Sequence, residues 1–189
     1  MDDIEWKGAS AWRPVMRFMW RHWQRTPVRT GAVAGFRLLA TATEVLVPVA
    51  AGRLVDGLSD GAPAVAWQAF WAMIALGVGM ILFRYASLRA LLPFTAQQMS
   101  DVAAEAFARV QALSADWHAN SFAGSTVRKI SRGMWAVDSF NDLVLMMLLP
   151  GFGVLVGTVI VMTLEWPVLG LVMAVGAALY LAATVLVAT

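Results

Sequence analysis

Two uninterrupted apolar runs constrain the fold of this chain more than any other feature. Residues 143–164 and 168–189 each contain 22 residues without a charged side chain. Because an α-helix rises about 1.5 Å per residue, each run can cross the roughly 30 Å hydrocarbon core of a bilayer. Two further segments, 31–55 and 67–93, have the same length or more, although a few charges interrupt them. The sequence therefore predicts an all-α polytopic membrane protein with four transmembrane helices.

The composition agrees with lipid as the solvent for most of the chain. Hydrophobic residues make up 60% of it and charged residues 14%, whereas about a quarter of a soluble domain is charged. The chain has no cysteine, which excludes disulfides and thiol nucleophiles. Its two histidines, His22 and His118, lie far apart in sequence, so we expect no metal site. A net charge of +2 is too small to favour a nucleic-acid partner.

The distribution of Lys and Arg predicts the orientation in the membrane. Segments 1–30 and 94–142 are rich in basic residues, whereas connections 56–66 and 165–167 contain none. Cytoplasmic loops carry an excess of Lys and Arg. We therefore expect a multi-pass protein of the cell (inner) membrane with a cytoplasmic amino terminus.

The first 30 residues have two interpretations. Arginines recur at every fourth position from Arg13 to Arg29, close to the helical period. Such a segment is either an amphipathic helix that turns its cations toward anionic lipid headgroups, or a basic flank without further role. In either case we expect Pro27 to end the helix before the first span.

The middle of the chain predicts a helical hairpin outside the bilayer. Residues 94–112 and 126–142 both place apolar residues at helical spacing, with no helix breaker at their membrane ends. As continuations of spans they would extend about 28 Å and 25 Å from the membrane. Between these arms lies SADWHANSFAG, residues 114–124, with cap and turn formers and Gly124 as the expected stop. A tip so far from lipid is expected to contact a soluble partner.

The sequence AFARVQALSADWHANSFAGSTVRKISRGMWAVDSF, residues 106–140, resembles the first cytoplasmic loop of ABC exporters. PVAAGRLVDGL, residues 48–58, is similar to the end of their first span, and the basic segment 1–30 resembles their elbow helix. The resemblance covers the whole chain. It implies the type-1 exporter transmembrane fold, here incomplete because that fold has six spans and residues 31–189 provide four. It implies the amino-terminal part of a half-transporter, whether a fragment, a split gene or a complete product.

The resemblance also implies a mechanism and its partners. The tip of the hairpin would couple the pore to a nucleotide-binding domain, and a second subunit, identical or different, would complete a dimer. The residues expected to make this contact are Ser114, Asp116, Trp117, His118, Asn120 and Phe122. No G-x-x-x-x-G-K-[ST] motif occurs, so we expect no cofactor and no catalytic residue in this chain. ATP and Mg²⁺ would belong to the separate domain.

Two charged residues in the first span are candidates for the translocation pathway. A carboxylate near mid-bilayer usually faces protein or water, so Glu44 could meet a substrate, with Arg37 seven residues earlier. Alternatively, Glu44 bonds an arginine or Thr of a neighbouring helix and Arg37 extends to the inner interface. For Arg84 the open choices are the inner headgroups and an inward-facing cavity.

Three functions remain open at this point. The first is the transmembrane portion of an ATP-driven exporter. The others are a four-helix scaffold or sensor that recruits a cytoplasmic protein, and an ion-coupled transporter that uses Glu44. The long matched arms favour the exporter over the ion-coupled transporter, which needs no distant soluble contact. No span carries a charge cluster or aromatic cage that indicates a substrate.

Overall fold

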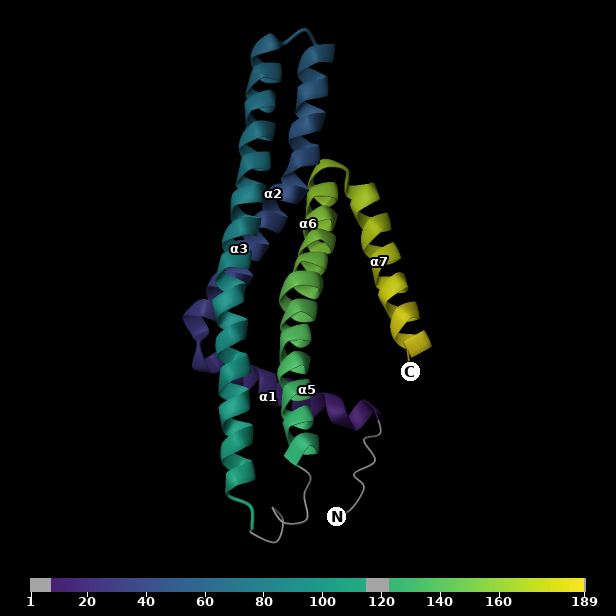
Figure 1. Cartoon of the computed structure of the whole chain (residues 1–189). Helices are drawn as coiled ribbons and strands as arrows, with labels where there is room; N and C mark the ends of the chain where they lie inside the picture. The colour runs from purple at the N-terminus through teal and green to yellow at the C-terminus, as the bar shows by residue number, and fades with distance from the viewer. Residues whose placement is uncertain (1–7, 115–122, 189) are drawn as a thin grey trace. The chain divides into compact units, whose positions relative to one another are not determined.

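The computed structural model describes residues 8–114 and 123–188 of the chain. In these ranges every regular element is helical (Figure 1). The elements follow in the order α1 (Gly8–Arg25), α2 (Pro27–Ser59), α3 (Pro63–Gln111), α5 (Ala123–Asn141), the π-helical segment η1 (Asp142–Leu148), α6 (Leu149–Glu165) and α7 (Pro167–Ala188).

Four helices are long and apolar enough to cross a membrane, which confirms the predicted number. They are Pro27–Ser59, Pro63–Gln111, Gly124–Glu165 and Pro167–Val187. No more than 17% of the most apolar stretch in any of them is buried within the chain. Such exposure of apolar side chains would be costly in water, so these surfaces require lipid or other membrane helices.

Prolines mark where several helices begin. α2, α3 and α7 start at Pro27, Pro63 and Pro167, where the missing N–H of proline removes no helical hydrogen bond. α1 ends at Arg25, as predicted for a break at Pro27. Inside a helix proline does remove a bond, yet α3 continues through Pro93 without interruption.

The connection between α2 and α3 is a glycine-terminated turn. Gly61 has φ of +66°, which is the left-handed conformation that residues with a Cβ adopt only at a cost. The N–H of Ala62 donates to the carbonyl of Gly57 at 2.9 Å. This bond across six residues is the Schellman motif, so the end of α2 is capped by its own backbone.

α6 and α7 form a tight antiparallel hairpin around a single residue (Figure 1). Trp166 has an extended backbone, and its N–H donates to the carbonyl of Met162 at 2.8 Å. A Cβ added to Gly170 would lie 2.5 Å from the Cα of Thr163, a distance that real Cβ atoms do not show. Only glycine fits at this crossing.

The two arms predicted beyond the spans are helical. α3 carries the first arm as far as Gln111, and α5 forms the second from Ala123. Gly124, which we expected to end the tip, instead lies in the first turn of α5. The rest of the tip, residues 115–122, lies outside the described residues.

The chain divides into two compact units. Unit 1 contains residues 1–34 and 88–144, and unit 2 contains residues 35–87 and 145–189. In unit 1, α1 packs against α3 and α5 through the buried side chains of Met19, His22, Phe94, Gln98, Val137 and Asn141. The buried core of unit 2 consists mainly of small residues, such as Ala40, Ala50, Ala66 and Ala69, together with Leu145.

Small residues bring α2 and α6 together in unit 2. Cβ atoms added to Gly153 and Gly157 would lie 3.1 Å from methyl groups of Thr41 and Val45, so both glycines allow close packing of the two helices. Gly31 and Gly35 have the same spacing, but nothing among the described residues lies within 4 Å of a Cβ at either position.

Candidate functional site

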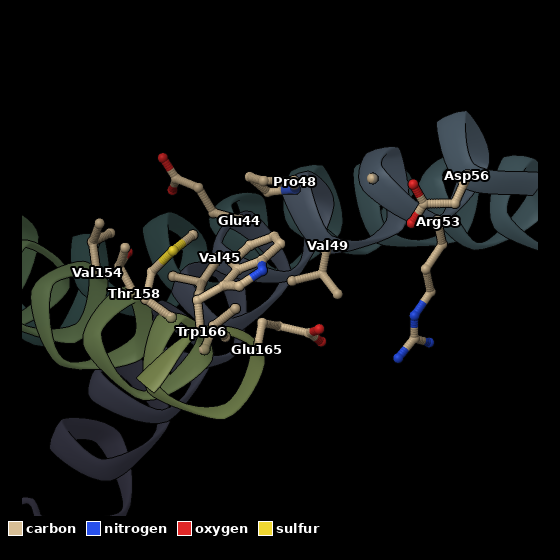
Figure 2. A pocket seen from close by; sticks show the side chains of 13 residues that line it. Glu44, Val45, Pro48, Val49, Arg53, Asp56, Val154, Thr158, Glu165 and Trp166 are labelled. Atoms are coloured by element: carbon tan, nitrogen blue, oxygen red, sulfur yellow. The ribbon is translucent and has the colours of Figure 1, made fainter. Parts of the chain in front are cut away.

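Unit 2 contains a groove of about 320 Å³ between α2 and α6, and Trp166 is among the residues that line it (Figure 2). Its walls are mostly apolar, and the volume lies at the lower end of the range of about 300–1,000 Å³ for small-molecule sites. Four charged side chains also line it: Glu44, Arg53, Asp56 and Glu165. The groove therefore combines mostly apolar walls with four charged side chains that could contact polar groups of a ligand.

Glu44 pairs with an arginine of the neighbouring helix. Arg84 of α3 donates through Nη2 to Oε2 of Glu44 at 2.8 Å, and each side chain remains a little under half exposed. This contact agrees with the second interpretation of Glu44, in which an arginine on another helix satisfies it. For Arg84 the sequence left open the inner headgroups and an inward-facing cavity, and the structure pairs it with Glu44, which itself lines the groove.

Arg37 binds a backbone carbonyl of the π-helical segment η1. The carbonyl of Met146 belongs to η1, and Pro150, four residues later, has no N–H to donate to it. Nη2 of Arg37 donates to this carbonyl at 3.0 Å. The expectation that Arg37 extends to the inner interface is therefore wrong, since its guanidinium binds backbone in η1 instead.

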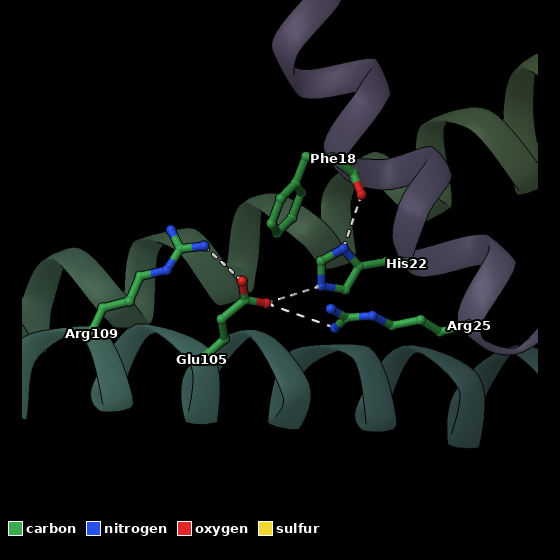
Figure 3. Close-up of polar contacts among 5 residues, drawn as sticks. All are labelled: Phe18, His22, Arg25, Glu105 and Arg109. Atoms are coloured by element: carbon green, nitrogen blue, oxygen red, sulfur yellow. Dashed lines mark hydrogen bonds and ion pairs between the residues drawn. The ribbon is translucent and has the colours of Figure 1, made fainter.

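In unit 1, the carboxylate of Glu105 on α3 lies within 4 Å of three nitrogen-bearing side chains (Figure 3). Its carboxylate lies 2.7 Å from Arg109 on the same helix, and 3.7 Å and 3.9 Å from Arg25 and Nε2 of His22 on α1. Nδ1 of His22 donates to the carbonyl of Phe18 at 2.9 Å, because a carbonyl can only accept. This arrangement ties the end of α1 to the arm of α3.

A second polar link joins α1 to both arms of unit 1. Nε1 of Trp23 donates to Oδ1 of Asn141 at 3.0 Å, and Nδ2 of Asn141 donates to Oε1 of Gln98 at 2.7 Å. Asn141 and Gln98 are almost completely buried. Because buried amides are costly unless bonded, this link fixes which faces of α1, α3 and α5 meet.

The family of the chain follows from comparison with known proteins. A family model described as the ABC transporter transmembrane region matches residues 31–189. The chain belongs to this family. ATP-binding cassette sub-family B member 6 of Xenopus tropicalis is 24% identical over 191 aligned positions, which cover 92% of this chain. The chain spans only 22% of the length of that relative. The search of solved structures found no match to this chain.

The structure places only some of the residues that the sequence predicted for the pathway and for the hairpin tip. Glu44 lines the groove, whereas Arg37 does not and instead binds the backbone of η1. Ser114 is exposed just beyond the end of α3. The remaining predicted tip residues lie outside the described part of the chain: Asp116, Trp117, His118, Asn120 and Phe122.

The sequence did not predict the polar contacts that join α1 to α3 and α5. Glu105 was expected to pair with Arg109, and it does, but nothing in the sequence indicated His22 as a further neighbour. The signal that could have indicated Asn141 is its position at the edge of an apolar run, where an unbonded amide would be costly. The partners of such an amide come from distant segments, so they required the fold.

Proposed function

We propose that this chain is the transmembrane portion of an ATP-driven ABC exporter in the cell (inner) membrane. It contributes part of the translocation pathway and receives mechanical work from a nucleotide-binding domain. Membership of the ABC transporter transmembrane family supports this function. The partner domain and a second transporter subunit belong to the proposal.

The observation that carries the proposal is the length of α3. This helix contains 49 residues, whereas about 20 are sufficient to cross a bilayer. At about 1.5 Å per residue it extends to roughly 74 Å, more than twice the thickness of the hydrocarbon core. The stretch Gly124–Glu165 is helical over 42 residues, which is also about twice the length needed to cross a bilayer. Helices of this length can carry their connection to a soluble domain well beyond the headgroups.

In the proposed mechanism, the connection between α3 and α5 docks on the nucleotide-binding domain. ATP-driven closure of two such domains moves this connection, and the arms transmit the movement to the membrane part as a rigid-body change. Trp117 and His118 are the proposed anchors, because aromatic residues contribute strongly at protein interfaces. ATP and Mg²⁺ act only in the partner domain.

The test uses Trp117→Ala in the assembled transporter, with Ser131→Ala on the exposed surface of α5 as the control. The Trp117 variant is expected to retain basal ATP hydrolysis and to lose transport and its coupling to hydrolysis. The control is expected to match the wild type in both. Unchanged coupling in Trp117→Ala would contradict the docking role.

The proposed orientation places the amino terminus and the arms in the cytoplasm. Since the chain has no cysteine, single cysteines report on topology without interference. In intact cells a membrane-impermeant maleimide is expected to label Ala62→Cys and to spare Ala112→Cys. The reverse pattern would refute the orientation.

Glu44 is the proposed contact for a polar group of the substrate, because its carboxylate lines the groove between α2 and α6. Arg37 is proposed to act on the pathway only indirectly, through the backbone of η1. Glu44→Gln should reduce transport while protein abundance remains unchanged. Transport at the wild-type rate would assign Glu44 a structural role with Arg84 alone.

A further inference from the structure

Unit 1 contains an apolar groove that the proposed transport mechanism does not use. It has a volume of about 590 Å³ and lies between α1 and α5. Its walls come from both helices and consist of apolar side chains and one glycine: Pro14, Val15, Phe18 and Met19 on one side, and Gly133, Ala136, Val137 and Phe140 on the other. Nothing lies within 4 Å of a Cβ at Gly133, so the groove is open there.

Exposed tryptophans on both helices indicate that this groove lies at the membrane surface. Trp20 of α1 and Trp135 of α5 are 58% and 65% exposed. Tryptophan is enriched at the level of the lipid headgroups, where its ring meets apolar chains and its N–H meets water. Phe140, which lines the groove, lies three residues before the charge-free run that starts at residue 143.

The rim of the groove is cationic. Arg17 and Arg21 flank Phe18 on α1, and Lys129 lies one turn before Gly133 on the same face of α5. All three side chains are exposed. Among the described residues none of the three takes part in an ion pair with a carboxylate. Their charge is therefore available to an external anion.

We propose that this groove binds an acyl chain of an anionic phospholipid from the adjacent leaflet, with the headgroup held by Arg17 and Arg21. The apolar walls match a hydrocarbon chain, and the unpaired cations match a phosphate with further negative charge. This charge complementarity favours an anionic lipid over a zwitterionic one and over a second copy of this chain, whose own groove carries the same cations.

The absence of cysteine allows a direct measurement in nanodiscs. Ala136→Cys, inside the groove, and Ser139→Cys, exposed on the same helix at similar depth, are labelled singly with a nitrobenzoxadiazole fluorophore. The quencher is a doxyl-labelled acyl chain on phosphatidylglycerol or on phosphatidylcholine. Quenching at residue 136 is expected at a lower mole fraction of phosphatidylglycerol than of phosphatidylcholine, and quenching at residue 139 is expected to be equal for both lipids.

Two kinds of variant test the walls and the rim separately. Gly133→Leu fills the groove and should abolish the preferential quenching at residue 136. Arg17→Gln and Arg21→Gln alter only exposed side chains and should each raise the phosphatidylglycerol needed for half-maximal quenching by about fivefold.

Three outcomes would overturn the proposal. Equal quenching at residues 136 and 139 would mean ordinary contact with surrounding lipid. Equal quenching by the two lipids would remove the role of charge. Shielding of residue 136 that depends on protein concentration and not on lipid would assign the groove to a second copy of the chain. The arginine variants keep the test valid even if Gly133→Leu does not fold.

Discussion

Replacing Asn141 by Leu should release α1 from unit 1. The Asn141 side chain is fully buried, and it bonds Trp23 of α1 and Gln98 of α3 at 3.0 Å and 2.7 Å. Leucine has a similar volume, so the change removes hydrogen bonds without leaving a large cavity. It isolates the polar contribution to the docking of α1.

The magnitude follows from the two bonds and from the groups they leave behind. Each bond contributes about 1 kcal/mol net, and a buried polar group without a partner costs about 1–3 kcal/mol more. Gln98 is 2% exposed, and its Nε2 already has no partner among the described residues, so the whole amide would be left unbonded. The expected loss is about 3–5 kcal/mol of the free energy that holds α1 in place.

Hydrogen exchange measures this loss locally. The amides of α1 in Asn141→Leu should exchange roughly 100- to 4,000-fold faster than in the wild type, since each 1.4 kcal/mol corresponds to a factor of ten. Ser139→Ala, exposed on the same helix, is the control and should change exchange by less than about threefold. A double-mutant cycle with Trp23→Phe should show a coupling energy of about 1 kcal/mol between the two positions.

The reasoning fails if α1 exchanges at the same rate in Asn141→Leu and Ser139→Ala. That result would mean that the apolar contacts of Met19 and Phe94, both almost fully buried, hold α1 without help from the polar link. A coupling energy near zero with Trp23→Phe would lead to the same conclusion for that bond alone.

Three further predictions concern unit 2. Gly157→Val should destabilise the packing of α6 on α2 by about 1–3 kcal/mol in reversible unfolding from micelles, because its Cβ would lie 3.1 Å from Val45. Glu44→Gln should lower the free energy of unfolding by less than about 1 kcal/mol, since the pair with Arg84 is nearly half exposed, and Arg84→Gln should have the same effect. Gly61→Ala should cost about 1–2 kcal/mol in the same assay because of the positive φ.

The controls for these changes come from the same helices. Gly151→Ala places a methyl group on α6 where nothing lies within 4 Å, and it should be neutral or slightly stabilising. A loss at Gly151 equal to that at Gly157 would argue against close packing as the cause. For the ion pair, a Glu44→Gln/Arg84→Gln double variant should lose no more than either single variant, and additive losses would contradict a direct pair.

The sequence predicted the spans and arms well because they depend on local pattern. Runs without charge at 143–164 and 168–189 have few alternatives to a membrane helix, and a helix continues past the bilayer unless a breaker stops it. Pro93 shows the limit of that rule, because α3 continues through it. The turn at Gly61 also depends only on nearby residues, because its positive φ and its hydrogen bond involve residues 57–62.

The contacts of individual polar residues could not be predicted in the same way. Glu44 could have bonded any arginine or Thr on a neighbouring helix, and only the packing of α2 on α3 selects Arg84. Trp23 and Asn141 are separated by 118 positions, and no periodicity links them. η1 was also not expected, because its stretch reads as ordinary apolar helix.

The bond from Arg37 to a carbonyl four residues before Pro150 bears on how the two positions can evolve. Pro150 has no N–H to donate to the carbonyl of Met146, and Arg37 donates to that carbonyl. The effect of a mutation at one position should therefore depend on the residue at the other. Alanine at position 150 would have an N–H, so a neutral side chain at position 37 should then be tolerated. Among homologues, loss of the arginine should follow loss of the proline, and seldom precede it.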